Sequence, residues 1–94
     1  MTTEIHVERK VVIASKVGLH ARPAATVAKA AGGLAAVVRI AKDGDPVDAR
    51  SLLSLISLGA EGGDTVILSS SGEGAQEAVD ALAELLASDL DHEG

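Results

Sequence analysis

A histidine stands where a loop is predicted to turn into a helix, in the stretch Gly18-Leu19-His20-Ala21-Arg22-Pro23-Ala24-Ala25. Pro23 falls in the first turn of this helix, where its missing N–H has no intrahelical partner to lose. The N–H groups that open the helix, that of Ala21 among them, are predicted to face the His20 ring together with the positive end of the helix dipole. An anion attached to the ring would be bound by these groups and by the Arg22 guanidinium. The stretch therefore predicts a phosphoryl group carried on an imidazole nitrogen.

Each of these residues also has an interpretation without chemistry. His20 could simply cap the helix, and Arg22 could be a solvated helix residue. Their spacing, with a glycine before and a proline after, favours the chemical interpretation. A histidine side chain ordinarily has a pKa of about 6.5, which leaves one ring nitrogen unprotonated and nucleophilic at pH 7. Gly18 is expected to permit the backbone turn that exposes the ring.

Hydrophobic periodicity predicts four strands and three helices. The strands are predicted over 7–14, 34–41, 46–49 and 65–70, and the helices over 21–31, 52–58 and 75–87. Gly32-Gly33 is expected to end the first helix, and the Asp43-Gly44 dipeptide to form a hairpin turn. Because the order is β-α-β-β-α-β-α in one small domain, the helices are expected to cover one face of one sheet, which indicates an α+β fold.

Composition bounds the class of protein. The 94 residues predict a single domain over 1–94, with ends at 1–5 and 89–94 that are expected to fray. The chain has no aromatic residue, so its core is aliphatic and it has no side chains for stacking bases, which argues against nucleic-acid binding. No export signal and no membrane-spanning apolar run are visible, which indicates a cytoplasmic protein. There is no cysteine and no ligand-like His or carboxylate cluster, so no metal or cofactor is expected.

Charge is uneven along the chain. Residues 1–50 hold eight basic and five acidic residues and carry a net charge of +3, whereas residues 51–94 hold nine acidic residues and no basic ones. One interpretation is an ordinary acidic soluble protein. The other is that Arg22, Lys29 and Arg50 form a positive field near His20 that attracts an acidic partner or a phosphate.

Two motifs resemble those of HPr, the family of histidine-containing phosphocarrier proteins of the bacterial sugar phosphotransferase system. Residues 18–24 resemble the family's active-site signature, and residues 46–59, PVDARSLLSLISLG, resemble the signature around its regulatory serine. Ser51 lies 31 positions after His20, the separation the family shows, and the resemblance covers nearly the whole chain. It implies an open-faced β-sandwich: a four-stranded antiparallel sheet with three helices on one face.

The resemblance also implies a function. A phosphoryl group from phosphoenolpyruvate would reach His20 through phosphorylated enzyme I, and His20 would pass it to enzyme IIA of sugar transporters. The reacting atom would be Nδ1, and Arg22 would be its charge partner. Such a protein is a carrier whose substrates are proteins, and it is not an enzyme acting on a small molecule. A monomer is expected.

Ser51 has two compatible interpretations. Serine is a preferred N-cap, and Ser51 precedes the predicted helix over 52–58. By resemblance it is also a candidate for regulatory phosphorylation by HPr kinase, a role that the family shows in some lineages only. A phosphate there would add about two negative charges beside the basic residues and oppose the docking of acidic partners.

The helix after Ser51 also predicts a docking surface. Leu55 and Leu58 can serve the core, which leaves Leu52 and Ile56 free to be exposed on another face. Exposed aliphatic side chains beside an active histidine suggest a patch that binds partners. In the family, enzyme I and the enzyme IIA domains dock on this helix and on the one after the histidine. Leu52, Leu53, Ile56 and Lys29 are the candidate docking residues.

Two other functions stay open. One is a paralogue of the same class that serves nitrogen or dihydroxyacetone control, since the sequence names neither the sugar nor the set of partners. The other is a regulatory module that docks on a transcriptional regulator through phosphorylated Ser51 with Leu52 and Ile56. The intact stretch from His20 to Pro23 disfavours a purely regulatory module, which could dispense with the histidine.

Overall fold

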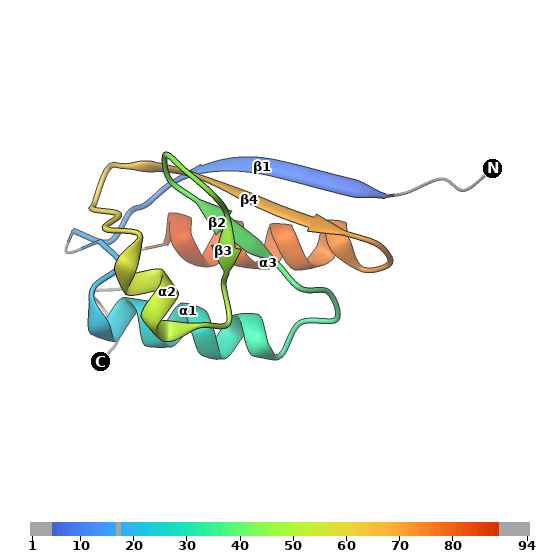
Figure 1. The fold of residues 1–94 in the computed structure, drawn as a ribbon, viewed down its shortest axis with the longest axis horizontal. Coiled ribbons are helices and arrows are strands. Elements are labelled where there is room, and N and C mark those ends of the chain that lie inside the picture. The colour runs from blue at the N-terminus through green and yellow to red at the C-terminus, as the bar shows by residue number, and fades with distance from the viewer. Residues whose placement is uncertain (1–4, 17, 89–94) are drawn as a thin grey trace.

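A computed structural model describes residues 5–16 and 18–88, and its elements follow the predicted order (Figure 1). In chain order they are β1 (His6–Val12), α1 (Ala21–Gly32), β2 (Arg39–Ala41), β3 (Val47–Asp48), α2 (Leu52–Ser57), β4 (Thr65–Ser71) and α3 (Ala75–Ala87). The strands form one antiparallel sheet in the order β1-β4-β2-β3. All three helices lie on one face of this sheet (Figure 1). The predicted open-faced α+β sandwich is confirmed.

The core lies between the sheet and the helices. Val11 pairs with Val66 across β1 and β4, and Ile40 pairs with Leu68 across β2 and β4; all four are buried. Val12, the next residue on β1, points the other way and is 54% exposed, as the alternation of a strand requires. The helices close the core with small aliphatic side chains, which are Ala24, Val27, Ala31, Val79, Leu82, Ala83 and Leu86.

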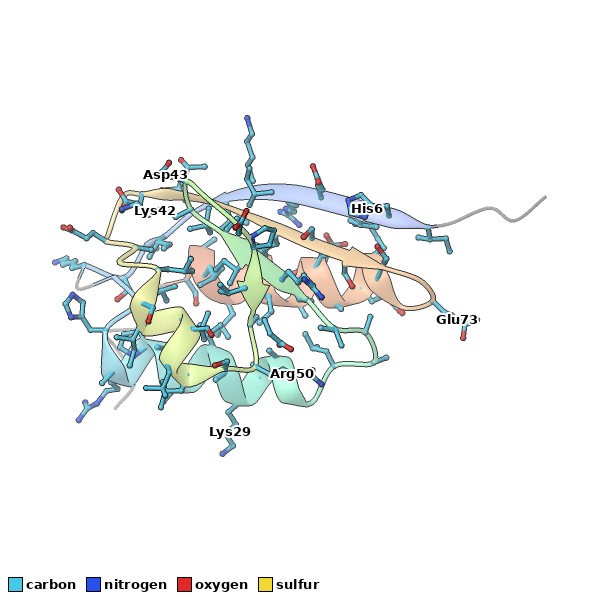
Figure 2. The ribbon with its side chains drawn as sticks, viewed as in Figure 1. His6, Lys29, Lys42, Asp43, Arg50 and Glu73 are labelled. Carbon is cyan, nitrogen blue, oxygen red and sulfur yellow. The ribbon has the colours of Figure 1, made fainter. Side chains whose placement is uncertain are left out.

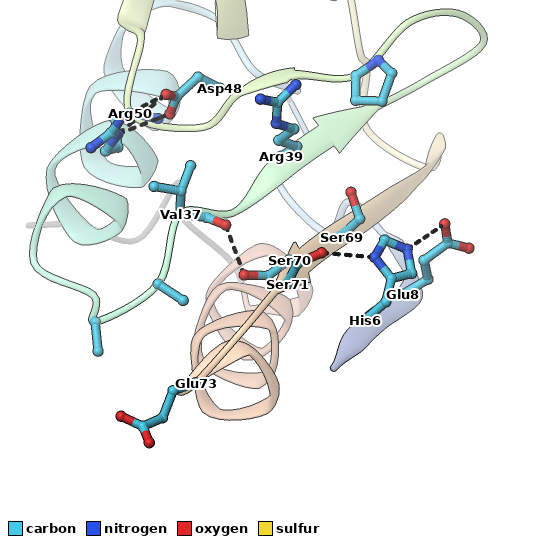
Figure 3. A pocket seen from close by; sticks show the side chains of 13 residues that line it. His6, Glu8, Val37, Arg39, Asp48, Arg50, Ser69, Ser70, Ser71 and Glu73 are labelled. Carbon is cyan, nitrogen blue, oxygen red and sulfur yellow. Dashed lines mark hydrogen bonds and ion pairs between the residues drawn. The ribbon is translucent and has the colours of Figure 1, made fainter. Parts of the chain in front are cut away.

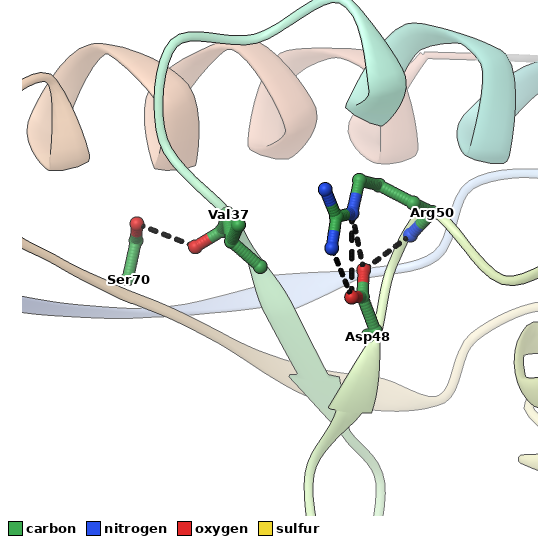
Figure 4. Close-up of polar contacts among 4 residues, drawn as sticks. All are labelled: Val37, Asp48, Arg50 and Ser70. Carbon is green, nitrogen blue, oxygen red and sulfur yellow. Dashed lines mark hydrogen bonds and ion pairs between the residues drawn. The ribbon is translucent and has the colours of Figure 1, made fainter.

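The predicted strand over 34–41 is too long. Only Arg39–Ala41 forms β2, and residues 33–38 connect it to α1, which ends at Gly32 with Gly33 as its C-cap. The Val37 carbonyl accepts a hydrogen bond from the Ser70 hydroxyl at 2.7 Å, so a side chain from β4 holds this connection (Figure 4). The apolar pattern of residues 34–41 therefore has another cause than strand pairing along the whole segment. It reflects the burial of Val38, which lies just before β2.

The first strand also ends early, at Val12 where residue 14 was predicted. Ile13 exchanges hydrogen bonds with the turn before β4: its N–H donates to the Asp64 carbonyl, and its carbonyl accepts from the Gly63 N–H, both at 2.9 Å. Because this pairing involves turn residues, the strand ladder stops, although Ile13 itself remains buried.

Two further expectations concern fraying at the chain ends and the lack of a membrane-spanning segment. Predicted fraying at 1–4 and 89–94 lies outside the described residues, while the Ile5 carbonyl accepts a hydrogen bond from the Gly72 N–H at 2.9 Å. No helix in the described part of the chain has both the length and the apolar character needed to cross a bilayer.

The short helix α2 offers a test of this packing. Leu55 is its one fully buried side chain, whereas Leu53 is 77% exposed. Leu55→Ala is expected to lower the free energy of unfolding by about 2–4 kcal/mol through a cavity and lost apolar burial. Leu53→Ala should change it by less than about 0.5 kcal/mol. Urea unfolding followed by circular dichroism measures both, and equal losses would contradict the assignment of the faces.

Candidate phosphorylation site

The loop before α1 is fixed by a close backbone contact. Gly18 has φ +68°, a conformation that glycine adopts without strain, and a Cβ on it would overlap the Ala60 carbonyl oxygen and the Glu61 Cα. The Leu19 N–H donates to the same Ala60 carbonyl at 2.9 Å, and the Leu19 side chain is buried. With both residues held, His20 is the first residue of the stretch that is exposed. Gly18 therefore makes the backbone turn before His20 and also makes room for a second loop.

His20 occupies the N-cap position of α1. Its backbone is extended, with φ −80° and ψ −174°, and its carbonyl accepts from the Ala24 N–H at 2.8 Å. The side chain makes no capping hydrogen bond, and the first turn contains no acidic residue. Pro23 is buried, while Ala21 and Arg22 are exposed beside the ring. The helix therefore opens with a bare positive dipole end next to an exposed imidazole, as predicted.

His20 lines two depressions that differ in their charged residues. The larger, about 490 Å³, is basic because its lining includes Lys16 and Arg22 as well as Glu61; His20, Ala21 and Pro23 complete it. The smaller, about 200 Å³, is lined by Leu19, His20, Ile56, Gly59, Ala60 and Glu61. An anion on the ring would be bound on the side of the basic depression, and the smaller depression brings Ile56 close to the ring.

The face of α2 next to the ring is exposed and aliphatic. Leu52 and Ile56 are each 40% exposed, and Leu53 is more exposed still, whereas Leu55 is buried. This is the assignment of faces that the sequence predicted. α2 packs against α1, and Ile56 shares the smaller depression with His20, so the apolar patch adjoins the candidate site.

Residues 7–88 match the protein-family model described as the PTS HPr component phosphorylation site. This chain belongs to the HPr family. It is 46% identical to the phosphocarrier protein HPr of Streptomyces coelicolor over 85 residues, which cover 89% of this chain and 91% of that protein. It is also 42% identical to the HPr-like protein Crh of Bacillus subtilis over 77 residues, which cover 82% of this chain and 91% of Crh.

Solved HPr structures share the fold. The structure of HPr-C-His from Thermoanaerobacter tengcongensis superposes with a TM-score of 0.84 at 36% identity and covers 94% of this chain and 99% of that one. The domain-swapped dimer of Bacillus subtilis Crh gives a TM-score of 0.64 at 38% identity, covering 88% of this chain and 95% of that one. The HPr fold is thereby shown independently of the motifs.

Two residues of the site escaped the sequence analysis. Lys16 lines the basic depression from the loop before Gly18, and Glu61 lines both depressions from the turn before β4. Lys16 could have been found from its position four residues before His20 in the same loop. Glu61 is 41 positions away along the chain, and only the tertiary contact between the two loops brings it to the ring.

Arg50 does not join the cations at His20. Its guanidinium binds the Asp48 carboxylate, with Nη2 2.8 Å from Oδ2, and its backbone N–H donates to Oδ1 at 2.9 Å (Figure 4). These hydrogen bonds hold the pKa of Asp48 below its usual value and raise that of Arg50. Arg50 lines a hollow of about 850 Å³ that neither His20 depression shares, and Lys29 lies in the last turn of α1, at the other end of the helix from His20. Of the three cations expected near His20, only Arg22 lines the site.

That hollow lies toward the open face of the sheet, at the end of the molecule with the turn between β4 and α3 (Figure 3). Its ionisable groups largely satisfy one another. Besides the Asp48–Arg50 pair, His6 Nε2 lies 3.2 Å from the Glu8 carboxylate and His6 Nδ1 lies 3.0 Å from the Ser71 hydroxyl. Lys29, labelled in Figure 2, extends from α1 on the helix side of the molecule.

Ser51 caps α2 as predicted. Its backbone is extended, and its hydroxyl accepts a hydrogen bond from the Ser54 N–H at 3.3 Å. The side chain is half-buried, and the exposed Leu52 and Leu53 follow it. Regulation by phosphorylation here stays a prediction.

An ion pair holds the turn that faces His20. Lys42, in the hairpin labelled in Figure 2, lies with Nζ 3.1 Å from the Asp64 carboxylate and donates to the Gly59 carbonyl at 3.2 Å. The Asp64 carboxylate also accepts from the Glu61 N–H at 2.8 Å. The Glu61 N–H and then Lys42 lower the pKa of Asp64, and the hydrogen bond with Asp64 raises the pKa of Lys42.

These shifts predict an acid-sensitive stability. The lowered pKa means that ionised Asp64 stabilises the fold above its unfolded-state pKa of about 4, and that this contribution is lost as the pH falls through the folded-state value. Asp64→Asn keeps the shape and removes the charge, so it should lower the midpoint of urea unfolding at pH 7 and make little difference at pH 3. Asp45→Asn, in the exposed hairpin, is the matched control. If Asp64→Asn lowered the midpoint of urea unfolding by the same amount at pH 7 and pH 3, this explanation would be wrong.

Proposed function

We propose that this chain is a phosphocarrier that accepts a phosphoryl group on His20 from phosphorylated enzyme I and passes it to enzyme IIA proteins. The observation that carries the proposal is the exposed imidazole at the uncapped N-terminus of α1, with Arg22 in the first turn. The family is that of phosphocarrier HPr proteins, which supports the same role. The site has two features of a carrier: an accessible nucleophile and groups that can bind an anion.

The chemistry needs only groups at the surface. The lone pair of an unprotonated ring nitrogen, Nδ1 by family resemblance, attacks the phosphorus, and the bond from phosphorus to the donor breaks as its electron pair leaves with the donor atom. The other ring nitrogen keeps its proton. Charge on the three phosphoryl oxygens is stabilised by the free N–H groups of the first turn, that of Ala21 among them, and by the Arg22 guanidinium. Transfer to the acceptor is the same step in reverse.

Partner binding is proposed to use the surface beside the ring. The exposed side chains of Leu52, Leu53 and Ile56 would contact apolar groups of enzyme I and enzyme IIA, and Lys29 and Arg22 would face their acidic groups. No ion pair or hydrogen bond of the described residues occupies the Lys29 or Arg22 side chains. We place the carrier in the cytoplasm as a monomer, and gel filtration tests the monomer against the dimers known for relatives.

His20→Ala is the direct test of the site. The variant should take up no label from phosphoenolpyruvate and enzyme I, because the nucleophile is gone, while its unfolding transition should match that of the wild type, because the ring is exposed. His6→Ala, which removes a histidine from the open-face hollow, should be labelled normally. Label on the His20→Ala protein would overturn the assignment.

A second variant tests the docking surface. Ile56→Asp should raise the concentration of carrier needed for half-maximal transfer from enzyme I by about tenfold, because it puts a charge into an apolar contact. Val37→Asp, which makes the same change at an exposed aliphatic residue of the far hollow, should leave that concentration unchanged. Equal kinetics for the two variants would place the docking surface elsewhere.

Regulation through Ser51 is a second proposal, and the similarity to Crh supports it, since that relative is the catabolite repression HPr of Bacillus subtilis. A phosphate on Ser51 would add about two negative charges at the edge of the docking surface. A purely regulatory protein has no need of phosphoryl uptake, so uptake on His20 separates the two functions. Mass spectrometry after incubation with HPr kinase and ATP, with Ser51→Ala as the control, tests the modification itself.

A further inference from the structure

Glu61 is the one acidic residue that lines the two depressions at His20, among the residues that the structure describes. It is exposed, and it lies in the turn between α2 and β4. The other charged side chains of the same site, Lys16 and Arg22, are basic. A carboxylate is therefore built into a site whose remaining groups suit an anion.

The backbone of Glu61 is held in this place from three directions. Its N–H donates to the Asp64 carboxylate at 2.8 Å, and Lys42 pairs with that carboxylate. Its Cα lies so close to Gly18 that no Cβ would fit between them. The next residue, Gly62, has no room for a Cβ either, because one would lie 2.5 Å from the Ser15 carbonyl oxygen. The turn cannot move away from the His20 loop without breaking these contacts, so the Glu61 side chain starts from a fixed place beside the ring.

We propose that Glu61 sets the phosphoryl-transfer potential of the carrier by repelling the phosphoryl group on His20. This inference rests on the proposed function. The phosphoryl group brings about two negative charges to a ring that carried none, so the Glu61 carboxylate raises the free energy of the phosphorylated form and leaves that of the free form nearly unchanged. Lys16 and Arg22 lower the same free energy. Glu61 therefore offsets part of the stabilisation by Lys16 and Arg22, and the phosphoryl group is easier to pass on than it would be without this carboxylate.

Glu61 takes no part in bond making. When the group leaves, the bond between phosphorus and the ring nitrogen breaks, its electron pair returns to the ring, and the acceptor atom forms the new bond to phosphorus. The carboxylate contributes only its charge, so its effect falls on the equilibrium between carriers. The equilibrium in which two carriers exchange one phosphoryl group does not depend on how tightly either docks on enzyme I, because enzyme I only catalyses the exchange.

The test is a competition between two carriers for one phosphoryl group. Wild-type protein and Glu61→Gln, one of them labelled with nitrogen-15, are mixed in equal amounts with catalytic enzyme I and less phosphoenolpyruvate than carrier. Intact-mass spectrometry then gives the phosphorylated fraction of each. Glu73→Gln, which makes the same change in the far hollow at the opposite end of the molecule (Figure 2), is the matched control.

At low salt we expect the ratio of phosphorylated to free carrier to be about threefold higher for Glu61→Gln than for the wild type in the same mixture. For Glu73→Gln mixed with the wild type, we expect the two ratios to be equal. Glu61→Lys should shift the partition further in the same direction, and added salt should reduce both shifts. The proposal would be overturned if Glu61→Gln took no larger share of the phosphoryl group than the Glu73→Gln control does, or a smaller share than the wild type. This comparison requires that the variants and the wild type have similar unfolding transitions. A wild-type protein that accepts no phosphoryl group would instead overturn the proposed function.

Discussion

The candidate site depends on the contact between two loops, in which Gly18 lies directly against Ala60 and Glu61. Both a positive φ and the absence of a Cβ are required there, so the position is doubly restricted to glycine. The same contact supplies the Ala60 carbonyl that accepts the Leu19 N–H and so sets the direction in which α1 begins. His20 is exposed because the residue before it is buried, and the fold thereby turns a packing constraint into an accessible nucleophile.

The distribution of charged residues explains how an acidic protein can present a site for an anion. The net charge of the chain is −6, yet the basic depression at His20 gathers Lys16 and Arg22 against Glu61 alone. Elsewhere three acidic side chains are paired with basic ones: Asp48 with Arg50, Asp64 with Lys42, and Asp80 with Arg9 at 2.9 Å. Exposed pairs contribute little to stability, and the main effect of these three is to neutralise basic side chains that lie away from His20.

The sequence predicted what depends on neighbours along the chain. The order of the elements, the cap at Ser51 and the exposed face of α2 all follow from spacing within one turn or one helix, and all are confirmed. The errors have a common physical origin. The length of β2 depends on a hydroxyl of β4, and the isolation of Arg50 from His20 depends on its pairing with Asp48 and on its place in the fold. Glu61 reaches the ring only through the contact at Gly18, which no local pattern specifies.

The helices α1 and α2 begin in different ways, and the difference bears on the proposed function. Ser51 satisfies an N–H of α2 with its hydroxyl, whereas the N-cap of α1 is a histidine whose side chain makes no such bond. A serine or aspartate at position 20 would stabilise α1 by about 1 kcal/mol relative to an uncapped start. It would also occupy the N–H groups that a phosphoryl oxygen needs. Without a side-chain cap these donors stay free for an anion, so under the proposed function the phosphoryl group would supply part of the stabilisation that a cap would have provided permanently.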